Sequence, residues 1–314
     1  MFKKIHRSAV MRFIATYAFA AVGAVAMAVG CTPQPAHAQT MRVATGPKLG
    51  TYSTMLKEIS GSCGVAGMSE QQTDGSMTNI DLLVGNQVNA AFVQADVLFF
   101  RARTENLSNV KTLLALHPEE VHIVALVNPK KEGGVMGIGA RQVSYNAITD
   151  LAGRTVGASG GSYVTAQVIR LQSEIPFQVV NVPSNDHLIA AIARGDLDAG
   201  IIVGGSPLNT ISALDPRFKL VGIPEQVQAK LRSVYNPARL NYAKIGAAGV
   251  PSVSTDAVFV TREYKTPKML GSLSEFRRCA TKAIPELKET LGTHPKWQAV
   301  DPTNHGKWPW YDLK

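Results

Sequence analysis

Two short segments place a hydroxyl residue and a tyrosine at the start of an expected helix. Gly50-Thr51-Tyr52 and Gly161-Ser162-Tyr163 each fall between a strand that ends in small residues and a helical pattern. Serine and threonine at such positions cap helices, and the unpaired backbone N–H groups beside them attract an anion. For either segment alone, a hydroxyl residue that only caps its helix and a tyrosine that only fills space would be a sufficient explanation. Their repetition favours two helix ends that grip a carboxylate.

A second pair of segments indicates an internal duplication. Val88–Val93 and Leu197–Ile202 match at an offset of 109 residues, and each follows an amphipathic helix. Two matches in the same order and at nearly the same offset predict two lobes of like construction. Gln94 ends the first of these strands, and Gly204, Gly205 and Pro207 lie in the corresponding turn after the second.

Further motifs, in their order along the chain, resemble the TAXI solute-binding subunits of TRAP transporters. They are Ala44-Thr45-Gly46, Thr73-Asp74-Gly75-Ser76 with Asn79, Val93-Gln94-Ala95-Asp96, Leu151-Ala152-Gly153-Arg154 and Gly160-Gly161-Ser162-Tyr163. The resemblance implies a type II periplasmic-binding-protein fold that delivers a small, usually carboxylated, solute to membrane permease subunits. The chain departs from the family at Pro47-Lys48-Leu49 and at His117, where an aromatic residue commonly precedes the proline.

These observations together predict a ligand site between two lobes, with no catalytic residue, metal or cofactor. The expected contacts are Thr45, Gly46, Gly50, Thr51, Tyr52, Ser76 and Gln94 on one side, and Ser159, Gly161, Ser162, Tyr163, Gly204, Gly205 and Pro207 on the other. We expect a small organic acid or amino acid, because helix ends offer neutral donors and the loops hold no cluster of acids for a polyamine or metal.

The elements that must position this site alternate between strand and helix, which predicts an α/β fold with mostly parallel sheets and helices on both faces. Apolar runs at Val121–Val127 and Ala257–Thr261 are the expected hinge crossings of a two-lobe, type II periplasmic-binding-protein fold. The expected division is residues 1–38 as a signal peptide, 39–127 as the first lobe, 128–257 as the second lobe, and 258–314 as a return to the first lobe.

The N-terminus has the pattern of an export signal. Basic residues precede an apolar run from Ile14 to Gly30, and Ala36-His37-Ala38 offers small residues for cleavage after Ala38. The run is short for a membrane span, which needs about 20 residues. Ala28-Val29-Gly30-Cys31 resembles a lipid-attachment site, so a lipoprotein anchored at Cys31 is the alternative. Either outcome places the protein outside the cytoplasm, with the periplasm expected.

Charge and cysteine content further narrow the class of protein to which this chain can belong. Loss of residues 1–38 would remove four of the 32 basic residues and none of the 23 acidic ones, which lowers the net charge from +9 to +5. No basic run interleaved with aromatics remains, so a nucleic-acid partner is not expected. Cys63 and Cys279 would be the remaining thiols, either as one disulfide or as two buried free thiols. Trp297, Trp308 and Trp310 are expected to hold the C-terminal tail against the first lobe of a monomer.

The sequence also bears on two other function classes, an enzyme and a ligand-sensing protein. An enzyme would need chemistry from His117, Glu119, Glu120 or His122, but the two histidines, five residues apart, share no face of a strand or helix. No nucleophile elbow, phosphate loop or His-Glu-x-x-His motif is present. A sensing protein that presents its ligand-bound form to a membrane receptor or kinase is the main alternative to transport, because both need the same ligand-dependent surface.

Overall fold

Ten strands form one mixed sheet in a computed structural model that describes residues 41–48, 50–63, 68–129 and 143–313. The strand order is β2-β1-β3-β10-β4-β7-β5-β6, with β8 beside β4 and β9 beside β10. The strands are β1 (Met41–Ala44), β2 (Met68–Gln71), β3 (Ala90–Gln94), β4 (Val110–Leu126), β5 (Thr155–Ala158), β6 (Gln178–Asn181), β7 (Ala199–Gly204), β8 (Phe218–Leu220), β9 (Asn236–Tyr242) and β10 (Ala247–Arg262). The predicted signal peptide, the cleavage after Ala38 and the alternative anchor at Cys31 lie outside the described residues.

The sheet repeats the same arrangement from its two ends. β1 is parallel to β2 and β3, and β5 is parallel to β6 and β7 in the same way. In these pairs Val43 lies opposite Ala90, and Val156 opposite Ala199. The matched segments thus form the equivalent strands β3 and β7, which confirms the predicted duplication. We call the half built on β1–β3 the first lobe and the half built on β5–β9 the second lobe.

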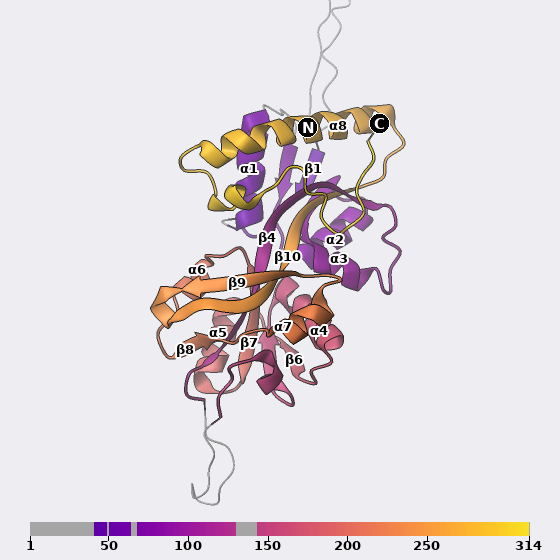
Figure 1. Cartoon of the computed structure of the whole chain (residues 1–314). Coiled ribbons are helices and arrows are strands. Elements are labelled where there is room, and N and C mark those ends of the chain that lie inside the picture. Colours follow the sequence, from indigo (N-terminus) through magenta and orange to yellow (C-terminus); the bar gives the residue numbers. More distant parts are fainter. Residues whose placement is uncertain (1–40, 49, 64–67, 130–142, 314) are drawn as a thin grey trace, which may run out of the picture. The chain divides into compact units, whose positions relative to one another are not determined.

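The long strands β4 and β10 join the two lobes and lie side by side (Figure 1). β10 pairs with β3 through Ala257–Thr261, and β4 pairs with β7 through Glu120–Ala125. The predicted crossings are therefore parts of these longer strands. Both pairings are antiparallel, as is that of β4 with β10. The expectation of mostly parallel sheets is wrong for this reason: parallel order is confined to the duplicated β-α-β units.

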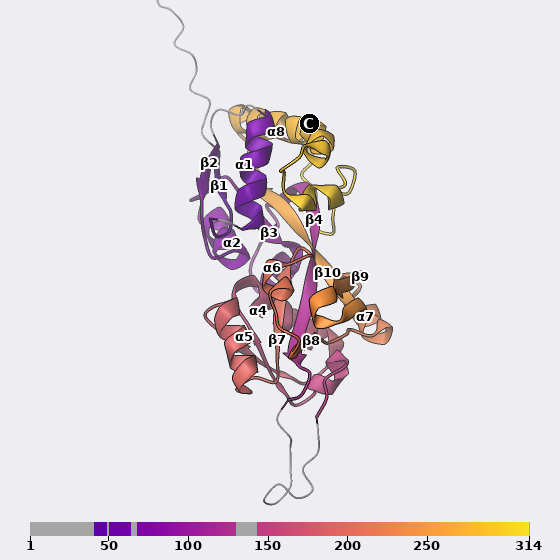
Figure 2. The ribbon, with the colours of Figure 1, turned by 90° about the vertical axis from the view of Figure 1, so that its left-hand side faces the viewer.

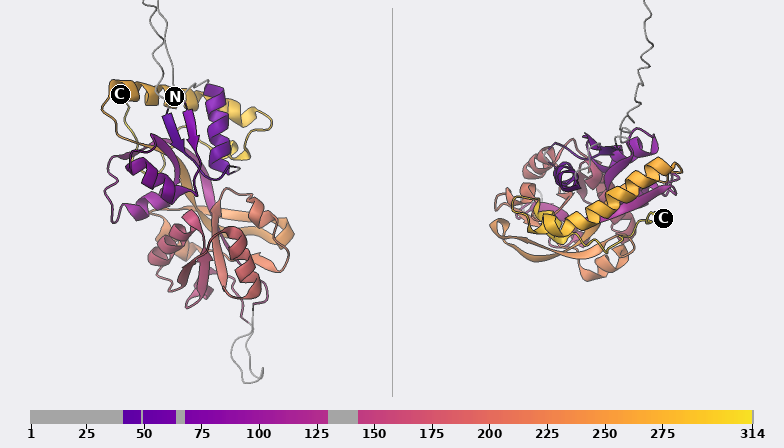
Figure 3. Two further views of the ribbon diagram at one scale, coloured as in Figure 1. Left: turned by 180° about the vertical axis from the view of Figure 1, so that it is seen from behind. Right: turned by 90° about the horizontal axis from the view of Figure 1, so that it is seen from above.

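Helices with buried apolar faces pack on the first lobe. They are α1 (Thr51–Cys63), α2 (Ser76–Val84), α3 (Ala95–Arg101), α8 (Pro267–Glu289) and the 3-10 helix η3 (Pro295–Ala299). Met55, Leu56 and Ile59 bury one face of α1. α8 begins with a proline, which suits the first helical turn, and lies beside α1 (Figure 2; Figure 3, right).

A disulfide between Cys63 and Cys279 joins α1 to α8, with the two Cα atoms 5.7 Å apart. Of the two predicted alternatives for these cysteines, the disulfide is confirmed. Trp297 of η3 donates from Nε1 to Glu58 Oε2 on α1 at 2.6 Å, and Trp308 donates from Nε1 to the Val110 carbonyl oxygen at 3.0 Å. These contacts hold the end of the described chain against the first lobe.

The second lobe carries its own set of helices. They are η1 (Ile148–Leu151), α4 (Gly160–Ser173), α5 (Asn185–Arg194), α6 (Asn209–Ser212), α7 (Glu225–Leu231) and η2 (Ala243–Ile245). Val164 and Val168 bury one face of α4, but Leu171 is 43% exposed and Ile175 lies beyond the end of the helix. Among the described helices, none has the length and apolar content needed to cross a membrane.

Candidate functional site

The carboxyl ends of the duplicated strands meet where β4 and β10 pass between the lobes. Gln94 at the end of β3 lies opposite Ala257 on β10, and Gly204 at the end of β7 lies opposite Glu120 on β4. In α/β folds, ligands bind outside the carboxyl ends of parallel strands at a point where the strand order changes. The topology therefore brings both strand ends to one candidate site at the boundary between the lobes.

Gln94 and Gly161 touch across this boundary. A Cβ atom at position 161 would lie 2.1 Å from Gln94 Oε1 and 3.8 Å from Ser76 Oγ, so only glycine fits against the present Gln94 rotamer. Ser76 Oγ accepts a 3.0 Å hydrogen bond from the Gln94 backbone N–H, which fixes the start of the β3–α3 connection. The Gln94 side chain is buried. Three predicted site residues from two lobes are thus brought together.

Tyr52 extends this group toward a buried carboxyl. Its hydroxyl donates to Glu119 Oε2 at 3.2 Å, and its ring stacks on Phe92 with centroids 5.3 Å apart. Glu119 is only 7% exposed, and burial raises its pKa from 4.5 to about 8. Burial, followed by the nearby Glu119 charge, raises the pKa of Tyr52 well above 10. Both groups are therefore neutral near pH 7, and the site combines a phenol with a protonated acid.

His117 lies two residues before Glu119 on β4 and is fully buried. Its Nδ1 atom is 3.1 Å from the Pro118 carbonyl oxygen, while Nε2 has no hydrogen-bond partner among the described residues. Burial lowers the pKa of His117 from 6.5 to about 3, so the ring is neutral.

The hydroxyl groups of other predicted residues are already engaged within their own lobes. Thr45 Oγ1 donates to Glu70 Oε1 at 2.8 Å, and Thr51 Oγ1 lies 3.3 Å from His294 Nε2. In the second lobe the partners are Asn185 for Ser159, the Val203 backbone N–H for Ser162, and Gln167 for Tyr163. The structure places Ser159, rather than Ser162, at the N-cap of α4. Ser162 thus ties α4 to β7 instead of capping its helix.

The glycines and the proline of the predicted set have different places. Gly46 lies beside the Tyr52 ring, and Gly50 precedes α1, with its N–H donating to the Pro47 carbonyl oxygen at 2.8 Å. Gly204 pairs with β4 at the boundary, whereas Pro207 follows a cis peptide bond and is exposed.

A largely buried ion pair flanks the site at Gly205. Lys296 Nζ lies 3.2 Å from both carboxylate oxygens of Glu120, and Glu120 Oε2 accepts from the Ser206 N–H at 2.6 Å. A Cβ atom on Gly205 would approach Lys296 Cε to 2.2 Å, so the lysine stem lies against this glycine. The pair connects η3, β4 and the turn after β7.

Glu119 and Lys296 lie in this region although the sequence pattern does not point to them as parts of a ligand site. An acid inside the long apolar run of β4 is the one signal that the sequence offers for Glu119. Within the described residues, no group of three or more His, Cys, Asp or Glu side chains could hold a metal ion.

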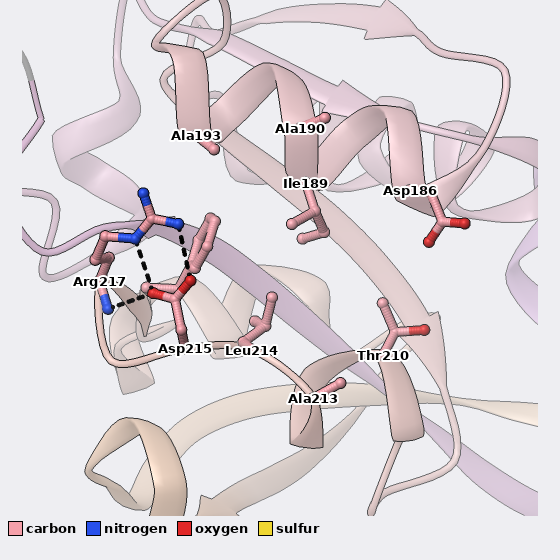
Figure 4. A pocket seen from close by; sticks show the side chains of 10 residues that line it. Asp186, Ile189, Ala190, Ala193, Thr210, Ala213, Leu214, Asp215 and Arg217 are labelled. Carbon is pink, nitrogen blue, oxygen red and sulfur yellow. Dashed lines mark hydrogen bonds and ion pairs between the residues drawn. The ribbon is translucent and has the colours of Figure 1, made fainter.

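A separate pocket of about 420 Å³ lies within the second lobe, between α5 and α6 (Figure 4). Ile189, Ala193 and Leu214 supply apolar lining, and Arg217 at its edge is paired with Asp215 at 2.9 Å. None of the predicted site residues lines this pocket. The boundary between the lobes remains the better candidate, because residues from both lobes meet there.

Comparisons with known proteins extend this picture. No family model matches the sequence, and no curated protein matches it. Among solved structures, Tv2483 bound to L-arginine is 12% identical, with a TM-score of 0.52 over 84% of this chain and 92% of that chain. Protein AF1704 from Archaeoglobus fulgidus is 13% identical, with a TM-score of 0.52 over 86% of this chain and 92% of that chain. An arginine-transport periplasmic binding protein from Legionella pneumophila is 11% identical, with a TM-score of 0.47 over 79% and 95% of the chains.

These likenesses concern the fold alone, since all three identities are low. The chain has a two-lobe α/β fold, and Tv2483 and AF1704 share its fold over 84% and 86% of this chain.

Proposed function

We propose that this chain is an extracytoplasmic solute-binding protein of the TAXI type, without catalytic activity, which captures a small carboxylated solute for the permease subunits of a TRAP-type transporter. The observation that carries the proposal is the contact of Gln94 with Gly161 where both duplicated strand ends meet. A site shared by two lobes couples ligand capture to lobe movement, which a membrane partner can recognise.

The chemistry of the boundary suits a small organic acid or amino acid. The first turn of α4 offers backbone N–H groups, and the Gln94 amide has both a donor and an acceptor. Glu119 can donate a hydrogen bond while protonated, or become ionised beside a ligand ammonium group. Within this class, an amino acid would use both the neutral donors and the acid.

The proposal includes export by the N-terminal signal, cleavage after Ala38 and action in the periplasm as a monomer. It also keeps the predicted lobe boundaries, with residues 39–127 and 258–314 in the first lobe and 128–257 in the second. The predicted contact set stays part of the proposal, with Glu119 added to it.

Isothermal calorimetry on wild type and Gln94→Ala tests this assignment directly. We expect wild type to bind a carboxylate, and the variant to bind it about tenfold or more weakly, because a ligand group buried at this position would lose its hydrogen-bond partner. Undiminished affinity in Gln94→Ala would place the ligand elsewhere.

A further inference from the structure

Asp96, two residues beyond Gln94, connects the lobes through its buried side chain. The residue lies in the first turn of α3 in the first lobe and is fully buried. Its Oδ2 atom accepts a 2.5 Å hydrogen bond from Thr165 Oγ1 on α4 and a 2.9 Å hydrogen bond from the Tyr235 hydroxyl. Both donors belong to the second lobe.

The geometry points to Asp96 as a positioning residue for ligand capture, which sets the first turns of α4 against Gln94 by binding Thr165 and Tyr235. This inference rests on the proposed function, because it assigns Asp96 a role in the same site without direct contact with the solute.

The connection from Asp96 to the site runs through one helical turn. Thr165 Oγ1 also lies 3.4 Å from the carbonyl oxygen of Gly161, four residues earlier in α4. Gly161 in turn lies against the Gln94 side chain. The β3–α3 connection therefore holds α4 at two points, through Gln94 at the site and through Asp96 one turn along the helix.

Asp96 is flanked by apolar residues of α3 and is tied to β10 through its backbone. Valine and leucine side chains of α3 and α4 belong to one apolar cluster around the boundary, among them Val97, Leu98, Val164 and Val168. The Asp96 backbone N–H donates to Thr255 Oγ1 on β10 at 3.2 Å, which anchors the start of α3 to the crossing strand.

One carboxylate oxygen, Asp96 Oδ1, is buried without a hydrogen-bond partner among the described residues. Burial accordingly raises the pKa of Asp96. Thr165 and Tyr235 supply the side-chain donors to this carboxylate, so loss of either hydroxyl leaves it less well paired and weakens the hold on α4.

Calorimetry and hydrogen exchange on the purified protein test the inference. The probes are succinate, citrate, L-glutamate and L-arginine, and the variants are Thr165→Val, Tyr235→Phe, Asp96→Ala and the double variant Asp96→Ala/Thr165→Val. Hydrogen bonds to a charged group contribute about 1.5–3 kcal/mol, which corresponds to a loss of affinity of about tenfold or more. We expect that loss in each single variant, and no further loss in the double variant.

Tyr145→Phe is the matched control, because Tyr145 also donates to a carboxylate, Asp198 at 2.6 Å, but entirely within the second lobe. It should lower thermal stability and leave affinity unchanged. In protein without probe, Asp96→Ala should speed amide exchange in residues 160–166 of the second lobe, and Tyr145→Phe should not.

Wild-type binding of a probe with unchanged affinity in all Asp96, Thr165 and Tyr235 variants would overturn the inference and leave the proposed function intact. If no probe binds wild type, the proposal of a carboxylate ligand fails for this panel. The role of Asp96 is then tested by amide exchange in residues 160–166, compared between wild type and Asp96→Ala. Unchanged exchange there would then overturn the role of Asp96.

Discussion

Gly161 of the second lobe lies so close to Gln94 of the first that a Cβ atom at position 161 would stand 2.1 Å from Gln94 Oε1. Gly161→Ala must therefore displace the Gln94 side chain. This side chain is flexible enough to move, but once displaced it can no longer bind the solute. We expect about tenfold weaker solute binding with little change in unfolding free energy, measured by calorimetry and urea denaturation.

Gly271→Ala provides the control for this substitution. Gly271 lies within α8, and no atom comes within 4 Å of a Cβ placed there. Alanine should stabilise the helix by about 0.5–1 kcal/mol and leave binding unchanged. Equal binding by both glycine variants would contradict the proposed place of Gln94.

Glu119 should make stability depend on pH. Its pKa rises from 4.5 to about 8 on burial, so its favourable contribution is complete below about pH 4.5 and is lost as the pH rises through about 8. In urea denaturation, wild type should lose stability relative to Glu119→Gln between pH 5 and pH 9, by a few kcal/mol, since each pKa unit is about 1.4 kcal/mol. If the difference in unfolding free energy between wild type and Glu119→Gln stays constant from pH 5 to pH 9, Glu119 keeps its ordinary pKa.

Lys296 should stabilise the boundary through Glu120. Lys296→Met leaves the largely buried Glu120 carboxylate with the Ser206 N–H but without its cation, and should cost about 3 kcal/mol of unfolding free energy. The double variant Lys296→Met/Glu120→Gln has no uncompensated charge and should recover most of this loss. Thermal or chemical denaturation of the three proteins measures the effect, and a double variant no more stable than the single one would argue against the ion pair.

The disulfide should support stability without affecting the site. Cys63 and Cys279 are 216 residues apart in sequence, so their bond restricts the unfolded chain over most of its length. The Cys63→Ser/Cys279→Ser variant should lose about 2–5 kcal/mol of unfolding free energy and keep its solute affinity. Loss of affinity without loss of stability would assign the bond a different role.

Much of the fold could be predicted from the chain because the duplicated β-α-β units carry local signals. Apolar runs and helical spacing identified β3, β7, α1 and the positions of both crossing strands. The antiparallel pairing of those crossings was not predictable from alternation, since it depends on how the chain leaves each lobe.

The candidate site was only partly predictable for a related reason. Gln94 was found because it ends a buried strand, and Gly161 because it begins a repeated segment. Glu119 has acidic and proline neighbours in the sequence, yet it lies inside β4 opposite Thr255 of β10 and is buried. Its burial follows from the pairing of strands that are more than a hundred residues apart in sequence, which local patterns do not encode.

A ligand screen tests the central claim most directly. Thermal unfolding of residues 39–314 would be measured with organic acids, amino acids, neutral sugars and inorganic cations. A ligand that binds only the folded state adds RT ln(1 + [L]/Kd) to the unfolding free energy and so raises the unfolding temperature. We predict stabilisation by at least one carboxylate, and its reduction in Gln94→Ala. Stabilisation by neutral sugars or cations, with none from any carboxylate, would contradict the account.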